Sequence, residues 1–296
     1  MISETAMITI CGRPNVGKST LANAFAGEKI AIVSDKPQTT RNRITAVCQR
    51  GETQFVFLDT PGFHKPRTRL GDYMVNVVRQ SVADVDAVLL VVEPVSAIGI
   101  QEKELMASFR ASNVPAVLAI NKIDTVKPET LLAVIAAYSA EFDFAAVVPV
   151  SAKTGEGVEE LLDELGKFAV ESPALFPEGS TTDQPERQVC AELIREKLLL
   201  HLDREVPHGT AVEITRFSER DDGIIDLEAT IYCEKASHKG IIIGRGGAML
   251  KKIGEAARTD IEAFMGTKVY MQTWVKVKEN WRDSQFLLRN FGFTEE

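Results

Sequence analysis

The feature that most constrains this chain is a glycine-rich octapeptide near its N-terminus. Residues 12–19 fit the pattern G-x-x-x-x-G-K-[ST] and follow the short apolar run 7–11, which has the character of a buried strand. Glycines at both ends allow a tight turn that aims backbone N–H groups at an anion, and the helix expected near Gly17 adds its positive N-terminus. The pattern predicts a phosphate-binding loop made of Gly12, Arg13, Pro14, Asn15, Val16, Gly17, Lys18 and Ser19, with Thr20 next to it.

Two side chains of this loop are predicted to act on the phosphates directly. Lys18 is long enough to reach the terminal phosphates. The Ser19 hydroxyl is placed to coordinate Mg²⁺, a hard cation that prefers oxygen ligands. Because a glycine-containing turn before an ordinary helix can match the same pattern, the interpretation depends on motifs further along the chain.

Three further polar motifs follow in order, each directly after an apolar run. The runs are 55–58, 116–120 and 147–150. Ligands of open α/β sheets bind at the carboxyl ends of the strands, so we expect these motifs beside the phosphate loop. They are Asp59, Thr60, Pro61 and Gly62, followed by Phe63; then Asn121, Lys122 and Asp124; and finally Ser151, Ala152 and Lys153.

The chemistry of these motifs favours guanine nucleotides. Asp124 can accept two hydrogen bonds from the N1–H and the exocyclic amino group of guanine, a donor pair that adenine lacks. A backbone amide of residues 151–153 can read guanine O6. Asp59 can hold a water bound to Mg²⁺, and the Gly62 N–H can contact a γ-phosphate with no Cβ in the way. Four motifs in this order predict a site for GTP and GDP.

Residues from Met7 to about Val170 resemble a translation-factor-type GTPase domain. The phosphate loop followed by Gln38-Thr39-Thr40-Arg41 is most similar to the Era/TrmE-type branch. In that family the threonine before the arginine belongs to the first switch loop and reaches Mg²⁺ in the triphosphate state. The resemblance implies this role for Thr40, with Thr39 as the alternative. The expected Mg²⁺ ligands are therefore Ser19, Thr40 and Asp59, and the expected catalytic and switch residues are Lys18, Thr39, Thr40 and Gly62.

One position departs from the Ras pattern. Phe63 stands where a Ras-like protein has the glutamine that orients the attacking water, and a phenyl ring makes no such hydrogen bonds. We expect slow intrinsic hydrolysis of GTP to GDP and phosphate unless another group supplies charge and positions the water. GTPases with a hydrophobic residue here resemble a class in which the loop asparagine, here Asn15, helps to hold a potassium ion. We assign no catalytic role to His64, because a histidine in a mobile loop more often faces solvent.

Length and composition indicate two domains. The chain has 296 residues, of which 45% are hydrophobic, and this is enough for two apolar cores. A stretch with three prolines and many turn formers separates the two parts. We predict an α/β P-loop GTPase domain at 1–172, with a mostly parallel sheet flanked by helices. A linker at 173–185 and a smaller α+β domain at 186–296 should follow.

Cysteine usage and hydropathy bear on the environment of the protein. The four cysteines show no C-x-x-C pairing, so we interpret them as free thiols in a reducing cytoplasm. The longest apolar stretch, residues 85–92, is far shorter than a bilayer span. We expect a cytoplasmic protein with at most peripheral membrane contact.

The second domain shows a mixed pattern of helices and strands. Alternating and helical spacings of apolar residues predict its elements in the order helix, two strands, two helices, strand and helix. The predicted helix at its start covers 186–204, the strands cover 212–217, 225–232 and 269–277, and the final helix covers 281–289.

A glycine-rich loop between the two central helices indicates RNA binding. A G-x-x-G turn lets a nucleic-acid backbone approach closely, and nearby lysines supply charge for the phosphates. Residues 237–247 resemble the KH-domain signature, in the type II variant with the extra strand before the loop. The predicted RNA-binding residues are Lys239, Gly244, Arg245, Gly246, Gly247, Lys251 and Lys252.

Local charge supports this interpretation although the total charge opposes it. The formal net charge is −8, which argues against general affinity for polyanions. From Lys235 to Lys252, however, five basic residues stand with no acidic residue among them. Such a cluster fits a short single-stranded RNA held in a groove.

Together the two halves resemble one family over nearly the whole chain, the Era family of ribosome-assembly GTPases. The resemblance implies binding near the 3′ end of small-subunit (16S) ribosomal RNA, a role in 30S subunit assembly and maturation, and loose association with the inner membrane. We expect a monomer. The alternatives are a tRNA-modification GTPase, which the absence of a cysteine near the C-terminus disfavours, and a membrane-associated regulatory GTPase, which the G-x-x-G loop disfavours.

Overall fold

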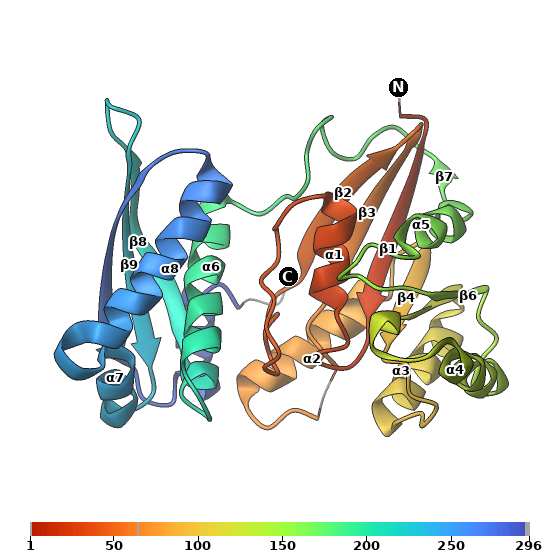
Figure 1. Ribbon diagram of the computed structural model, residues 1–296, viewed down its shortest axis with the longest axis horizontal. Helices are drawn as coiled ribbons and strands as arrows, with labels where there is room; N and C mark the ends of the chain where they lie inside the picture. The colour runs from red at the N-terminus through yellow and green to blue at the C-terminus, as the bar shows by residue number, and fades with distance from the viewer. Residues whose placement is uncertain (1, 64, 294–296) are drawn as a thin grey trace. The chain divides into compact units, whose positions relative to one another are not determined.

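The computed structural model describes residues 2–63 and 65–293 and divides into two compact units (Figure 1). The first unit contains Met1–Ala31, Thr40–Lys65 and Met74–Asp183, and the second contains Ile32–Thr39, Pro66–Tyr73 and Gln184–Glu296. Two short segments from the N-terminal half of the sequence therefore belong to the unit that holds the C-terminal half.

The first unit is built on a seven-stranded sheet. The strand order is β2-β3-β1-β4-β5-β6, and β7 pairs with β1 outside this path. Strands β3, β1, β4, β5 and β6 run parallel, whereas β2 is antiparallel to β3 and β7 is antiparallel to β1. The predicted, mostly parallel sheet is confirmed. The strands are β1 Glu4–Cys11, β2 Ile44–Arg50, β3 Thr53–Asp59, β4 Ala87–Val92, β5 Ala116–Ile120, β6 Ala146–Pro149 and β7 Val170–Glu171.

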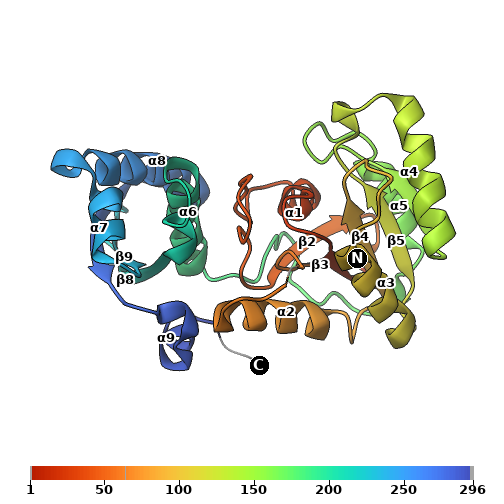
Figure 2. The same cartoon turned by 90° about the horizontal axis from the view of Figure 1, so that it is seen from below.

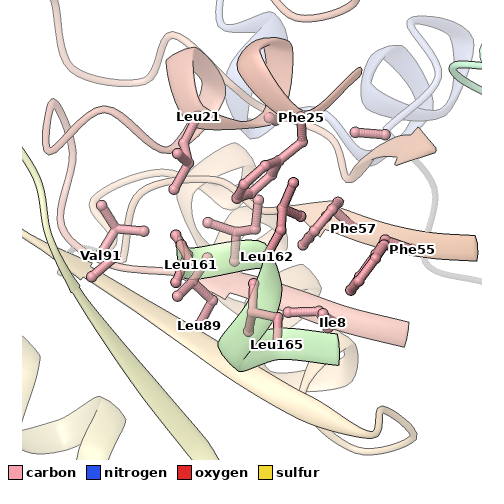
Figure 3. Packing of buried hydrophobic residues seen from close by; sticks show 14 of the residues in the cluster. Ile8, Leu21, Phe25, Phe55, Phe57, Leu89, Val91, Leu161, Leu162 and Leu165 are labelled. Atoms are coloured by element: carbon pink, nitrogen blue, oxygen red, sulfur yellow. The ribbon is translucent and has the colours of Figure 1, made fainter. Parts of the chain in front are cut away.

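Helices cover both faces of this sheet because its central strands are apolar on both sides. On one face, Leu21 and Phe25 of α1 and Leu161 and Leu165 of α5 share an apolar cluster with Phe57 of β3 (Figure 3). On the other face, α2, α3 and α4 form a second apolar core. The helices are α1 Lys18–Ala26, α2 Arg69–Ser81, α3 Ile100–Ser112, α4 Pro128–Glu141 and α5 Val158–Gly166.

This topology brings the four sequence motifs to one edge of the sheet. The phosphate loop follows β1, and Asp59 is the last residue of β3. Asn121 directly follows β5, and Ser151 comes soon after β6. Because these four strands are parallel, their carboxyl ends meet at the same edge, where open α/β sheets bind their ligands.

The second unit contains a three-stranded sheet with helices packed against it (Figure 2). The strand order is β10-β9-β8, with β10 parallel and β8 antiparallel to β9. Apolar side chains of α6 and α8 share a core with the three strands. The elements are α6 Glu186–His201, β8 Ala211–Glu219, β9 Ile225–Cys233, α7 Ala236–Ile243, α8 Ala248–Met265, β10 Val269–Val277 and α9 Gln285–Asn290.

The C-terminal end differs from the single helix predicted at 281–289. A 3-10 turn at Trp281–Asp283 precedes α9, which begins only at Gln285. Ser284 caps α9 by accepting a hydrogen bond from the Leu287 N–H, and the buried Trp281 indole donates to the Gly209 carbonyl (2.9 Å). The prediction was wrong because the serine cap and this tertiary contact outweigh the apolar spacing.

The cysteines are free, and three of them are buried, namely Cys11, Cys190 and Cys233. Burial raises the pKa of Cys11 to about 12, so this thiol stays protonated near neutral pH. Across residues 2–63 and 65–293, we find no helix with the length and apolar character needed to cross a membrane.

Candidate functional site

The phosphate loop depends on backbone conformations that favour glycine and asparagine. Gly17 has a φ of +99°, and a Cβ there would collide with the Asn121 side chain. A Cβ at Gly12 would collide with the carbonyl of Val91. Asn15 has a φ of +66°, in the left-handed region that asparagine tolerates better than most residues. The loop therefore holds its shape through backbone geometry as well as hydrogen bonds.

Lys18 lies folded across this loop. Its Nζ donates to the carbonyl oxygens of Gly12 (3.1 Å) and Arg13 (2.9 Å). Burial lowers the pKa of Lys18, while the nearby charge of Asp59 acts in the opposite direction. A phosphate oxygen within reach would stabilise the buried Lys18 ammonium more than these neutral carbonyls do, because a charged acceptor makes a stronger hydrogen bond.

The Asn121 side chain joins three loops of the site. Its Nδ2 donates to the Val16 carbonyl (2.8 Å), and its Oδ1 accepts from the Ala152 N–H (2.9 Å). The backbone N–H of Asn121 donates to the Val92 carbonyl (2.8 Å). A buried amide with both ends bonded fixes the spacing between the phosphate loop and residues 121–124 and 151–153.

The residues predicted to read guanine lie together at this edge. The Ser151 hydroxyl donates to Oδ1 of Asp124 (2.8 Å). Lys122 donates through Nζ to the Asn15 carbonyl (2.7 Å) and pairs with Glu93. The Asp124 carboxylate thus offers acceptor oxygens beside the phosphate loop, whereas the Ala152 N–H is already bonded to Asn121 and the Ser151 N–H to the Glu156 carbonyl. The other predicted residues at this edge are Pro14, Thr20, Thr60, Pro61 and the exposed Lys153.

Three side-chain oxygens converge beside Lys18. Ser19 Oγ lies 2.7 Å from Thr40 Oγ1 and donates to Asp59 Oδ2 at 2.7 Å. The other carboxylate oxygen of Asp59 is buried and has no hydrogen-bond partner among the described residues. One carboxylate with two hydroxyls suits a hard cation that completes its shell with water and phosphate oxygens, so these residues fit Mg²⁺. A cluster of three or more His, Cys, Asp or Glu residues able to hold a metal occurs nowhere in the described part of the chain.

The structure separates the two threonines that the sequence left as alternatives. Thr40 is buried and meets Ser19, as described above. The Thr39 hydroxyl bonds instead to Ser34 Oγ (2.8 Å) and to the Lys36 carbonyl (2.6 Å). Of the two threonines, Thr40 lies beside Ser19, a predicted Mg²⁺ ligand, whereas Thr39 stabilises a local turn.

Gly62 and Phe63 lie directly against the phosphate loop. A Cβ at Gly62 would lie only 2.7 Å from the Pro14 Cα, so the close approach requires glycine. The Phe63 side chain is buried in the apolar core, and its N–H donates to the Gly12 carbonyl (3.1 Å). The phenyl ring therefore serves packing. His64 lies outside the described residues.

The G-x-x-G loop connects α7 and α8 through three glycines with positive φ. Gly244 has a φ of +72°, and a Cβ there would lie 2.7 Å from the Met249 Cβ. Gly246 and Gly247 have φ values of +59° and +82°, and apart from adjacent residues no atom of residues 2–63 or 65–293 lies within 4 Å of a Cβ placed at either. The last two glycines, with the exposed Arg245 before them, thus face open space, where a polymer backbone can approach.

A groove with a volume of about 510 Å³ runs beside this loop, between α8 and β10. Gly247 and the charged residues Lys251, Glu255 and Arg258 line one side, and β10 contributes Tyr270. Since β10 is an edge strand, its outer backbone groups can pair with a ligand. Sequence reasoning missed Arg258, although its seven-residue spacing from Lys251 places both on one face of the helix.

The structure brings only part of the predicted RNA-binding set to the groove. Lys252 is not among the described lining residues, although it follows Lys251 directly. Lys252 is exposed, and its charge is the second cause, after burial, of the lowered pKa of His201. Lys239 is half-buried within α7 and is likewise absent from the described lining.

Comparison with known proteins identifies the family. The family model described as 50S ribosome-binding GTPase matches residues 7–122, and the KH domain model matches residues 205–282. GTPase Era of Ruminiclostridium cellulolyticum is 49% identical over 293 residues, covering 99% of this chain and 98% of that protein. The chain belongs to the GTPase Era family. GTPase Era of Clostridioides difficile strain 630 is 48% identical over 295 residues, covering 99% of both proteins.

Two solved Era structures share the architecture of this chain. A variant of Aquifex aeolicus Era bound to GDP and AlF4⁻ has a TM-score of 0.95 at 35% identity, covering 99% of this chain and 100% of that one. Era in complex with MgGDPNP and nucleotides 1506–1542 of 16S ribosomal RNA has a TM-score of 0.94, the same identity and the same coverage. The predicted P-loop GTPase and KH domains are confirmed, as is GTP hydrolysis as the activity. The relatives named above are Era proteins. The expected Era/TrmE-type assignment is therefore corrected to Era.

The buried Asp59 predicts a pH dependence of stability. Burial raises the pKa of Asp59 to about 6, against the opposing effects of Lys18 and of the Ser19 hydrogen bond. A carboxyl whose pKa is higher in the folded chain contributes stability below its unfolded pKa, and this is lost as the pH rises through its folded pKa. Without nucleotide or metal, the free energy of unfolding of the wild type should fall by on the order of 2 kcal/mol relative to Asp59→Asn between about pH 4 and pH 6.

Denaturant unfolding followed by circular dichroism across this pH range measures the difference. Asp143→Asn, which changes an exposed carboxylate, serves as the control and should run parallel to the wild type. Parallel curves for wild type and Asp59→Asn would contradict the prediction.

Proposed function

We propose that this protein is a GTP-binding and GTP-hydrolysing switch that binds 16S ribosomal RNA near its 3′ end and assists assembly and maturation of the 30S subunit. The observation that carries the proposal is one chain with both a phosphate-loop site and an open G-x-x-G groove. The Era structure with MgGDPNP and a 16S fragment matches both domains. The family model that matches residues 7–122 is described as 50S ribosome-binding, but the Era structure holds 16S RNA, so we favour small-subunit RNA.

In this proposal the phosphates lie in the loop of residues 12–19. Lys18 would leave its carbonyl partners for the phosphate oxygens, and the Gly62 N–H would meet the γ-phosphate. Ser19, Thr40 and Asp59 would hold Mg²⁺, whose charge supports phosphoryl transfer. Thr40 and Gly62 would complete these contacts only with a γ-phosphate in place, so they would order their loops with GTP and release them after hydrolysis.

The base would lie against residues 121–124 and 151–153. Asp124 would accept hydrogen bonds from N1–H and the exocyclic amino group of guanine, while an amide of residues 151–153 meets O6. Asn121 would position these groups without touching the base, because its side chain is already bonded to the loops on both sides.

We extend the proposal to a potassium ion near Asn15. Phe63 is buried and cannot orient the attacking water, so another group must supply charge at the γ-phosphate. We expect hydrolysis to be about tenfold faster in potassium than in sodium, and the difference to be lost in Asn15→Ala. Phosphate release measured in the two salts tests this. Equal wild-type turnover in both would rule out the ion.

The RNA site is tested by binding of a short single-stranded RNA that matches the 3′ end of 16S ribosomal RNA. By fluorescence anisotropy, we expect tight binding with a non-hydrolysable GTP analogue and weaker binding with GDP. Gly246→Asp should weaken binding at least about tenfold, because a carboxylate would meet the RNA backbone in the open space beside the loop.

Gly179→Asp is the matched control. Gly179 also has a positive φ, and a Cβ placed there meets no atom of the described part of the chain beyond its neighbours. It lies outside the residues that match the KH domain model, so its substitution should leave RNA binding unchanged. An RNA affinity that changes neither with the bound nucleotide nor in Gly246→Asp would contradict the proposed RNA site.

The proposal also includes a monomer in the cytoplasm with loose peripheral association with the inner membrane. The membrane association rests on the family resemblance, and the cytoplasm rests on the unpaired cysteines. Sedimentation of the purified protein tests the first, and fractionation of cells tests the other two.

A further inference from the structure

The groove between α8 and β10 has one acidic side chain in its described lining, that of Glu255. This side chain is 62% exposed, and the basic residues of the same lining are Lys251 and Arg258. A carboxylate repels phosphate groups, so Glu255 opposes the attraction that the basic residues exert on an RNA backbone. A favourable contact from RNA to Glu255 must come from a hydrogen-bond donor, which the phosphates lack.

The three charged residues lie along one face of α8. Positions 251, 255 and 258 are separated by four and three residues, which is the spacing of neighbours on a helix surface. Lys251 and Arg258 are about 10 Å apart along the helix axis, and Glu255 stands between them. An RNA strand whose phosphates lie near the two basic residues would therefore bring an intervening nucleotide close to the carboxylate.

Glu255 is available for such a contact because its own ion pair is weak. Lys251 Nζ lies 3.9 Å from Glu255 Oε1, and the side chain of Lys251 is 77% exposed. Arg258 Nη1 lies at the same distance from Glu262 Oε1, one turn further along the helix. Exposed ion pairs of this length contribute little free energy, so both basic residues can turn to phosphates while Glu255 accepts another donor.

Other residues of the lining suit the face of a base. Leu250, Gly254 and Met271 are half-buried and carry no charge. Unpaired bases are commonly recognised with the ring face packed on protein and the polar edge hydrogen-bonded. A base packed on these three residues would turn its polar edge toward the rim of the groove, where Glu255 stands.

The chemistry of a carboxylate decides which base fits. An ionised carboxylate accepts hydrogen bonds and donates none. Cytosine presents an exocyclic amino group as a donor, whereas uracil presents a carbonyl oxygen at the same position. We propose that Glu255 is a specificity-determining residue of the RNA groove and selects cytosine over uracil. The inference rests on the proposed RNA site and adds the class of base that this site reads.

Two oligomers that differ only in the base test this role. Labelled oligocytidylate and oligouridylate of equal length are titrated with the full chain and a non-hydrolysable GTP analogue, and fluorescence anisotropy gives the affinities. The wild type should bind oligocytidylate about tenfold more tightly, the effect of replacing one base-specific hydrogen bond by a repulsive contact.

Glu255→Gln should bring the two affinities within about twofold of each other, because an amide can both donate and accept hydrogen bonds. The affinity for oligouridylate should also rise, since a negative charge beside the phosphates is lost. Glu255→Asp keeps the carboxylate and should retain a preference for oligocytidylate.

Glu219→Gln is the matched control. Glu219 is exposed on β8, at the opposite edge of the sheet from β10, so this substitution removes the same charge and should leave the ratio of the two affinities unchanged. Equal wild-type affinities, as expected if Glu255 meets only the 2′-hydroxyl of the sugar, would overturn the inference, and so would a cytosine preference that persists in Glu255→Gln. An oligocytidylate affinity that is unchanged in Gly246→Asp would instead refute the proposed RNA site on which the inference rests.

Discussion

The buried amide of Asn121 is the contact on which the nucleotide site most depends. The phosphate loop, the base-reading residues and residues 151–153 come from three separate strand ends, and sheet topology alone brings them only to the same edge. Hydrogen bonds from Asn121 to Val16 and from Ala152 to Asn121 fix the distances between them. Gly17 is part of the same constraint, because any side chain there would displace the amide.

The charges of the site are arranged so that a nucleotide and its cation complete them. Burial lowers the pKa of Lys18 and raises that of Asp59, so each is held where its charged form is less favoured than in water. Phosphate oxygens would supply a charged partner to Lys18, and Mg²⁺ would supply one to Asp59. The fold therefore holds two charged groups that ligand binding would stabilise. Shifted pKa values of this kind are common at functional sites.

The sequence predicted the motifs and the order of elements because both are local patterns. The strand-like runs before each motif, the phosphate loop and the G-x-x-G turn all depend on near neighbours in the chain. The remaining features depend on distant contacts. The Thr39 hydroxyl bonds to Ser34 and Lys36, whereas the Thr40 hydroxyl contacts Ser19. The spacing of residues in the sequence does not show this difference. Likewise, α6 holds the segment 32–39 through side chains more than 150 residues further along the chain.

We propose that one guanine-nucleotide site controls RNA binding at the G-x-x-G groove. Asp124→Asn tests it most directly, because asparagine replaces an acceptor with a donor and should move the preference from guanine to xanthine. The 16S 3′ RNA would be titrated into this variant with a non-hydrolysable analogue of GTP or of xanthosine triphosphate. We expect tight RNA binding with the xanthosine analogue alone, the reverse of the wild type. An RNA affinity that is the same with either nucleotide analogue would contradict nucleotide control of RNA binding.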